Sequence, residues 1–256
     1  MNILGLVKGI LHKRKELDIK KLPSQGLFYN DDFKIFIKKA DIEDIREYES
    51  NFMKDVGVII SKINKIVFKN TLFSSGYSYN DIKSIDILYT FLEIVKYTNK
   101  KSIKVSYYDE SKNKESNIEF NSKYFNYFKI NEELKKMYND KEKCFDIFGY
   151  KYTMPSVGVE NSLASYLIKK SKQDIDIDKY NNYCYDFTYF VGNKNKLSFN
   201  EVENLIEVFN YDIEGSEMDK ISKIIKKFEP LQIYSLTNGE EKIDLNAKID
   251  LSKIWD

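Results

Sequence analysis

The sequence is poor in the residues on which many catalytic and metal sites depend. Its 256 residues include one His, two Cys, one Trp and three Pro. The single histidine, His12, lies in a basic N-terminal segment, so the rest of the chain lacks the imidazole that Ser-His-Asp and Cys-His arrangements need. A zinc site built from cysteine and histidine would also need carboxylate ligands. We therefore expect a protein that is not an enzyme and that holds no metal and no cofactor.

The other possible sources of chemistry are equally weak. Cys144 and Cys184 lack the Cys-x-x-Cys spacing of zinc and redox motifs, and their aromatic neighbours favour buried structural thiols. The segment Gly5–Gly9 lacks the Lys-Ser/Thr ending of a phosphate-binding loop. The acidic run that contains Asp174, Asp176 and Asp178 lacks the glycine and distal glutamate of a calcium loop, which favours a solvated turn over a cation site.

The chain also lacks an excess of charge and a long apolar run. Lys+Arg 41 against Asp+Glu 40 gives a net charge of +1, which provides no overall field for nucleic acid or an anionic membrane. No segment approaches the roughly 20 apolar residues of a membrane span. Two alternatives stay open: a nucleic-acid-associated factor that uses lysine-rich helices and exposed aromatics, and a metal- or carboxylate-dependent enzyme.

Apolar residues are plentiful: 42% of the chain is hydrophobic and 15% aromatic, enough for a sizeable core. Residues 1–21 are predicted to form a basic amphipathic leader, whose apolar side chains include Ile3, Leu6, Val7 and Ile10. Its charges follow the apolar stretch, which is the reverse of a secretory signal. The leader is predicted to dock on a partner or to pack on its own domain.

The most distinctive stretch is Leu22–Tyr29, with the sequence LPSQGLFY. Pro23 fixes its own φ and favours extended backbone at Leu22, and Gly26 permits a turn with positive φ. Phe28 and Tyr29 then lead into alternating residues typical of a strand. The stretch is predicted to be an extended arm that turns sharply into a first strand, packed on its own sheet or held by a neighbouring subunit.

The remaining pattern alternates helices with hairpins. Helices are predicted over 42–49, 53–68, 81–98, 131–139, 159–170, 175–191, 198–209 and 218–228, and hairpins over 102–120 and 231–245. Residues 145–154 are predicted to form two short strands or one bulged strand around Gly149. Ser198 and Glu201 form a predicted capping box. The aromatic cluster at 124–128 is typical of a core or an interface, and less so of a base-stacking surface.

No regular strand-helix-strand rhythm appears. The predicted fold is therefore α+β, with helices and small antiparallel hairpin sheets and no doubly wound parallel sheet. Beyond the leader, we expect an α+β region over 22–156 and a helical region over 157–256 that closes with a hairpin. These two regions are separate or form one continuous domain.

Leu22–Tyr29, followed by a strand and an acidic helix, resembles the start of the baseplate hub and hub assembly proteins of contractile-tailed bacteriophages of the T4 type. The resemblance extends in weaker form over 22–256, through the helix at 81–98, the hairpin at 102–120 and the closing Ile254-Trp255. Several members of that family carry Cys-x-x-Cys pairs at hairpin tips. Here the tips at 109–116 and 237–240 contain no cysteine, so a zinc staple is not expected.

The resemblance implies a structural or assembly protein of a contractile tail baseplate that catalyses no reaction. Its implied partners are other baseplate proteins within a symmetric multi-subunit assembly, and its implied location is the virion, after assembly in the host cytoplasm. The candidate partner-contact residues are Ile3, Leu6, Val7, Ile10, Leu22, Pro23, Gly26, Phe28 and Tyr29.

Overall fold

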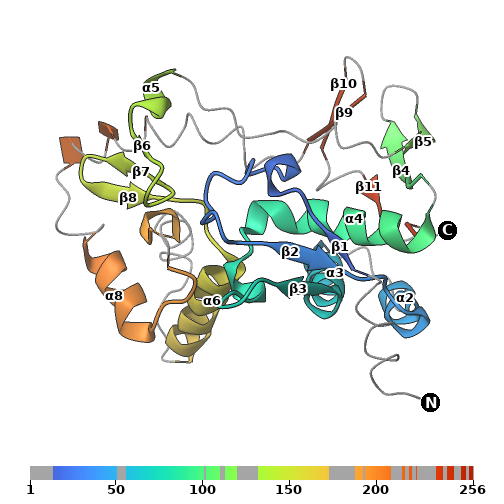
Figure 1. Cartoon of the computed structure of the whole chain (residues 1–256), viewed down its shortest axis with the longest axis horizontal. Helices are drawn as coiled ribbons and strands as arrows, with labels where there is room; N and C mark the ends of the chain where they lie inside the picture. The colour runs from blue at the N-terminus through green and yellow to red at the C-terminus, as the bar shows by residue number, and fades with distance from the viewer. Residues whose placement is uncertain are drawn as a thin grey trace.

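The fold was established from a computed structural model of the whole chain (Figure 1). The structure describes residues 14–50, 56–100, 102–109, 113–119, 132–172, 188–192, 194–208, 215–216, 219–220, 223, 235–238, 241–244, 249–251 and 254–255. Within these residues it has helices and small antiparallel sheets, which confirms the α+β prediction.

The first sheet lies in the N-terminal third of the chain. It consists of β1 (Lys15–Glu16), β2 (Ile35–Ile37) and β3 (Thr71–Phe73), in that order and antiparallel throughout. The accompanying helices are α2 (Ile42–Glu49), α3 (Val56–Asn70) and α4 (Ile87–Asn99). Because β1 pairs with β2 and Leu17 is buried, residues 15–17 belong to this fold and not to a separate leader. Residues 1–13 of the predicted leader lie outside the described residues.

Helix α4 is the centre of the first apolar core. Residues 89–95 are buried on all sides of the helix, which is typical of a helix surrounded by other elements rather than one lying on a surface. The C-terminal Trp255 completes this core, since its indole meets the rings of Tyr48 and Phe91 edge-on at 6.1 and 6.0 Å. We call this set of buried side chains, from Leu17 to Ile103 with Val157 and the C-terminal residues, the first core.

The second core surrounds another sheet. Strands β6 (Tyr138–Asn139), β7 (Cys144–Ile147) and β8 (Tyr150–Tyr152) are antiparallel neighbours, packed with α6 (Val157–Ser171) and α8 (Phe199–Glu207). Figure 1 shows β6, β7, β8 and α8 at the opposite end of the molecule from α2, with α6 between the two ends. Most residues of the second core lie between Leu134 and Ile206, so the cores do not divide the chain at residue 156 as the predicted regions did.

The remaining strands of the described residues also form antiparallel sheets. Strands β4 (Lys104–Asp109), β5 (Lys114–Glu119) and β11 (Ile249–Asp250) form one sheet, while β9 (Ser235–Asn238) pairs with β10 (Glu241–Asp244). The predicted hairpins at 102–120 and 231–245 are thus confirmed as strand pairs. Of the two alternatives predicted for 145–154, the structure has the two short strands, β7 and β8, which pair with each other. Asn238, predicted in the last turn, instead pairs with Glu241.

Two predicted helices differ from the structure. The helix predicted from residue 81 starts at Ile87, because the chain first forms the 3-10 turns η2 (Tyr79–Asp81) and η3 (Ser84–Asp86). The helix predicted over 131–139 is reduced to α5 (Glu132–Lys135), and Tyr138 instead enters β6. The predictions over 124–128, 175–187 and most of 218–228 lie outside the described residues.

Candidate functional site

The arm, residues 22–29, is not extended as predicted, because it consists of consecutive tight turns. It leaves the 3-10 turn η1 (Ile19–Lys21), and Gln25 and Gly26 take φ values of 54° and 75°. The Gln25 N–H donates to the Leu22 carbonyl at 2.8 Å, and the Leu27 N–H donates to the Ser24 carbonyl at 3.2 Å. The predicted positive φ at Gly26 is confirmed, and this backbone region disfavours any residue with a side chain.

The side chains of the arm lie inside the chain's own cores. Leu22 and Tyr29 belong to the first core, where the Tyr29 ring stacks on Phe33 at 4.3 Å. Phe28 belongs to the second core, 6.0 Å from the ring of Phe145. Consecutive residues of the arm therefore enter different cores, and the arm joins them.

This placement corrects part of the predicted partner-contact set. Leu22, Pro23, Phe28 and Tyr29 are buried, because the two cores need their apolar surface, and they are not offered to a partner on the folded surface. Gly26 is half-buried, and its Cα faces Ile19. The other candidates, Ile3, Leu6, Val7 and Ile10, lie outside the described residues and stay a prediction.

A buried carboxylate fixes the arm to the start of α4. Asp86 accepts hydrogen bonds from the Ser24 N–H at 2.9 Å and the Tyr29 hydroxyl at 2.7 Å. The Tyr29 oxygen in turn accepts the Lys83 N–H at 2.9 Å. These polar groups are buried and satisfy one another, which is the condition for a buried polar network to stabilise a fold. Lys83 and Asp86 are not among the predicted site residues, and their signal in the sequence is two charges inside the apolar run Ile82–Leu88.

Burial shifts the protonation of this network. Loss of hydration raises the pKa of Asp86 to about 6, against the hydrogen bonds from Tyr29 and Ser24, which favour the charged form. Burial likewise lowers the pKa of Lys83 to about 8, although Asp86 and Asp81 partly offset it. Burial and the Asp86 carboxylate both raise the pKa of Tyr29. We call Ser24, Tyr29, Lys83 and Asp86 the buried junction.

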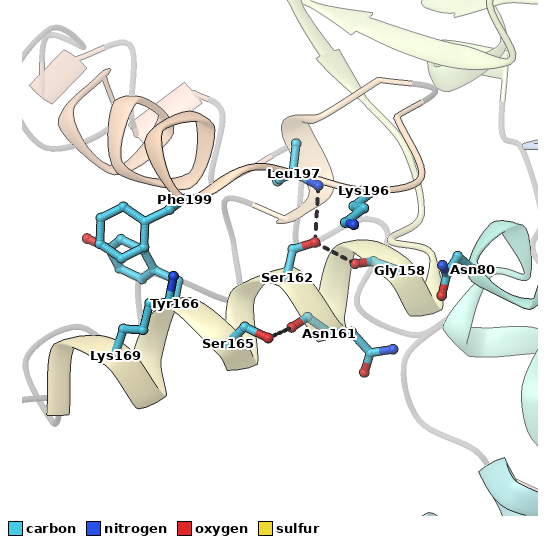
Figure 2. Close-up of a pocket in the computed structure, with 10 residues that line it drawn as sticks. All are labelled: Asn80, Gly158, Asn161, Ser162, Ser165, Tyr166, Lys169, Lys196, Leu197 and Phe199. Atoms are coloured by element: carbon cyan, nitrogen blue, oxygen red, sulfur yellow. Dashed lines mark hydrogen bonds between the residues drawn. The ribbon is translucent and has the colours of Figure 1, made fainter. Parts of the chain in front are cut away.

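An open groove lies along one face of α6 (Figure 2). Its volume is about 200 Å³. Helix α6 supplies Gly158, Asn161, Ser162, Ser165, Tyr166 and Lys169, which recur at the three- and four-residue steps of one helix face. The facing wall is the segment Lys196–Phe199, and Asn80 of η2 closes one end. We call this feature the α6 groove.

Close approach of the chain at Gly158 holds the two walls together. A Cβ atom at Gly158 would lie 1.9 Å from the carbonyl oxygen of Asn195, so the wall can pass only over a glycine. The Leu197 N–H donates to the Ser162 hydroxyl at 3.1 Å, and that hydroxyl donates to the Gly158 carbonyl at 2.7 Å. Asn195 also donates to Asp81 at 2.6 Å. The groove is thus a built feature of the fold.

A second surface is apolar. Ile60 and Phe68 of α3 are 51% and 62% exposed, with Asn64 between them at four-residue steps on one helix face. The ring of Tyr79 meets Phe68 edge-on at 5.4 Å, and its hydroxyl donates to Asn64 Oδ1 at 3.0 Å. We call Ile60, Asn64, Phe68 and Tyr79 the α3 face.

Among the described residues, no cluster of three or more His, Cys, Asp and Glu side chains is placed to hold a metal ion. Asp174, Asp176 and Asp178 lie outside them, as does Cys184. Cys144 is buried as predicted, and burial raises the pKa of its thiol. No helix in the described part of the chain has the length and apolar character needed to cross a membrane.

No protein-family model matches this chain, and neither the curated proteins nor the solved structures include a significant match.

Proposed function

We propose that this protein is a structural or assembly protein of the hub region of a contractile bacteriophage tail baseplate. It acts through contacts with other baseplate proteins, within a symmetric assembly, and catalyses no reaction. The observation that carries the proposal is the stretch Leu22–Tyr29, on which the sequence resembles that family.

The position of Leu22–Tyr29 between the two cores indicates that this stretch is tied to the fold of the chain. A surface stretch can be shared by unrelated chains, whereas each distinctive residue here has a task set by the architecture. Gly26 takes the positive φ of the turn, Phe28 fills the second core, and Tyr29 fills the first core and hydrogen-bonds to Asp86.

The surface offers two places for protein contact. The α3 face presents exposed apolar side chains, and the α6 groove presents polar and cationic ones. They adjoin at η2, because Tyr79 belongs to the α3 face and Asn80 lines the groove. Apolar surface bordered by polar groups is the usual composition of a protein interface.

The proposal is tested by deleting the gene from the phage that encodes this chain and examining lysates by electron microscopy. We expect heads without functional tails, with normal tails restored when the chain is supplied from a plasmid. The matched control is a plasmid carrying Gly26→Val, which should fail to restore tails because valine does not tolerate the φ of Gly26. Normal, infective tails in the absence of the gene would contradict the proposal.

A further inference from the structure

The charges around the α6 groove are unevenly compensated. The carboxylates near its walls have donors: Glu203 is paired with Lys170 at 2.6 Å, Glu201 with Lys194 at 2.8 Å, and Asp81 accepts from Asn195. Lys169 and Lys196 line the groove itself, and neither has a carboxylate partner among the described residues. None of the described residues that line the groove is acidic. Among them, the uncompensated charge that faces a ligand is therefore positive.

The aromatic end of the groove is already occupied by the chain's own side chains. The Phe199 ring lies 4.7 Å from the ring of Tyr166, and the ammonium groups of Lys169 and Lys170 lie 5.3 and 5.4 Å from its centre. Recognition of single-stranded nucleic acid relies on open ring faces on which bases stack. Phe199 already interacts with these two ammonium groups, so its ring acts as a support that holds Lys169 beside the groove.

The middle of the groove carries hydrogen-bonding groups. Figure 2 shows Asn161 and Ser165 on the α6 wall between the two lysines. Lys196 lies beside Leu197, which is tied to Ser162, seven residues before Lys169 on α6. At 1.5 Å per residue, the Cα atoms of Ser162 and Lys169 are about 10 Å apart along the helix axis. An extended peptide covers that length in about three residues.

We infer that the α6 groove binds an extended acidic segment of a protein partner, whose carboxylates contact Lys169 and Lys196. The inference rests on the proposed function and names the chemistry of one partner. A groove of about 200 Å³ that is open to solvent suits side chains of such a segment better than an enclosed metabolite, because pockets for small molecules are typically larger and bury most of their ligand. Complementary charge gives such a contact its specificity.

The test is an NMR titration of the full-length, isotope-labelled chain with a short serine-glycine peptide carrying two glutamates about three residues apart. We expect shifts centred on residues 161–169 and 196–199, weakening as salt is raised. The peptide with glutamine in place of glutamate should bind at least about tenfold more weakly. The double variant Lys169→Glu, Lys196→Glu should cause a similar loss, and it should fold because both side chains are exposed.

The matched control is the double variant Lys20→Glu, Lys136→Glu, which changes the net charge equally at exposed positions outside the groove lining and should leave binding unchanged. Equal weakening by both double variants, or shifts outside the groove, would overturn the inference. So would tighter binding of a single-stranded DNA oligonucleotide at the same residues. Failure here, with tails still dependent on the gene, removes the groove assignment and leaves the proposed function standing.

Discussion

Tyr29 donates a hydrogen bond to Asp86 over 2.7 Å, although the two residues are 57 positions apart in the sequence. Tyr29 comes from the arm and belongs to the first core, while Asp86 immediately precedes α4. The bond therefore fixes a distinctive local stretch to the helix at the centre of the fold. The residues around it provide direct tests of the structure.

Tyr29→Phe should destabilise the protein by about 1–3 kcal/mol, the usual cost of leaving a buried polar group without its partner. The variant keeps the stacking on Phe33 but removes the donor to Asp86 and the acceptor of the Lys83 N–H. Urea unfolding measures the change. Tyr77→Phe is the matched control, because the Tyr77 hydroxyl bonds Asp32 near solvent; it should cost less than about 0.5 kcal/mol. Equal effects of the two substitutions would contradict the buried junction.

Asp86 should make stability fall as the pH rises from about 4 to about 6. Its pKa is raised in the folded protein from 3.8 to about 6, so the folded state binds the proton more tightly than the unfolded chain does. The stabilisation is complete below the unfolded value and is lost as the pH rises through the folded value. Two pKa units correspond to about 3 kcal/mol.

The measurement is the free energy of unfolding of the wild type and of Asp86→Asn across this pH range. The difference between the two proteins isolates Asp86 from other carboxyls, such as Glu160, whose pKa burial also raises. We expect the wild type to lose stability relative to Asp86→Asn between pH about 4 and 6, with a constant difference above about 7. A difference that does not change with pH would refute the burial of a titrating Asp86.

Lys83→Met should stabilise the protein at neutral pH. The folded state lowers the pKa of Lys83 to about 8, so keeping the ammonium charged inside the protein costs free energy below that pH, and the cost is relieved as the pH rises from 8 towards the usual 10.5. Methionine fills similar space without a charge. We expect a gain of roughly 2–3 kcal/mol at pH 7 that disappears near pH 10. Lys141→Met, at an exposed position, is the control and should show neither effect. A net loss of stability at pH 7 for Lys83→Met would contradict a destabilising buried charge at Lys83.

Gly158→Ala should weaken the fold and displace the wall of the α6 groove. The new methyl group would lie 1.9 Å from the Asn195 carbonyl oxygen, and overpacking of this kind costs about 1–3 kcal/mol. Thermal unfolding gives the loss, and amide shifts at 195–199 report movement of the wall. Gly215→Ala, which would meet nothing within 4 Å, is the control and should be neutral or slightly stabilising. Unchanged shifts at 195–199 would show that the chain does not pass over Gly158.

Features set by neighbouring residues could be predicted from the sequence. The positive φ of Gly26, the capping box of Ser198 and Glu201, and the hairpins at 102–120 and 231–245 depend on local backbone chemistry, and the structure has them all. The start of α4 could not be predicted in this way. The apolar spacing of Ile82 and Ile85 fits a helix, but both residues precede it, because Lys83 and Asp86 are bound to the arm from 54 to 62 positions away.

The candidate surfaces could not be predicted from the sequence either, because they also depend on contacts between distant parts of the chain. A pattern of apolar residues in the arm does not reveal whether they face their own core or a partner, and burial of Phe28 and Tyr29 depends on rings such as Phe145 and Phe33. The α6 groove joins Asn80, α6 and Lys196–Phe199, three separate parts of the chain. Tertiary packing at Gly158 and the hydrogen bonds to Ser162 and Asp81 bring these walls together.

The most direct test of the central proposal is quantitative mass spectrometry of purified virions and of tail-assembly intermediates from infected cells. The account predicts that this chain is present in one or both fractions, together with the hub proteins and in a fixed ratio to them. Presence in virions would identify a baseplate component, and presence in intermediates alone would identify an assembly factor that leaves. Its absence from both fractions, while it is expressed during infection, would contradict the proposed function.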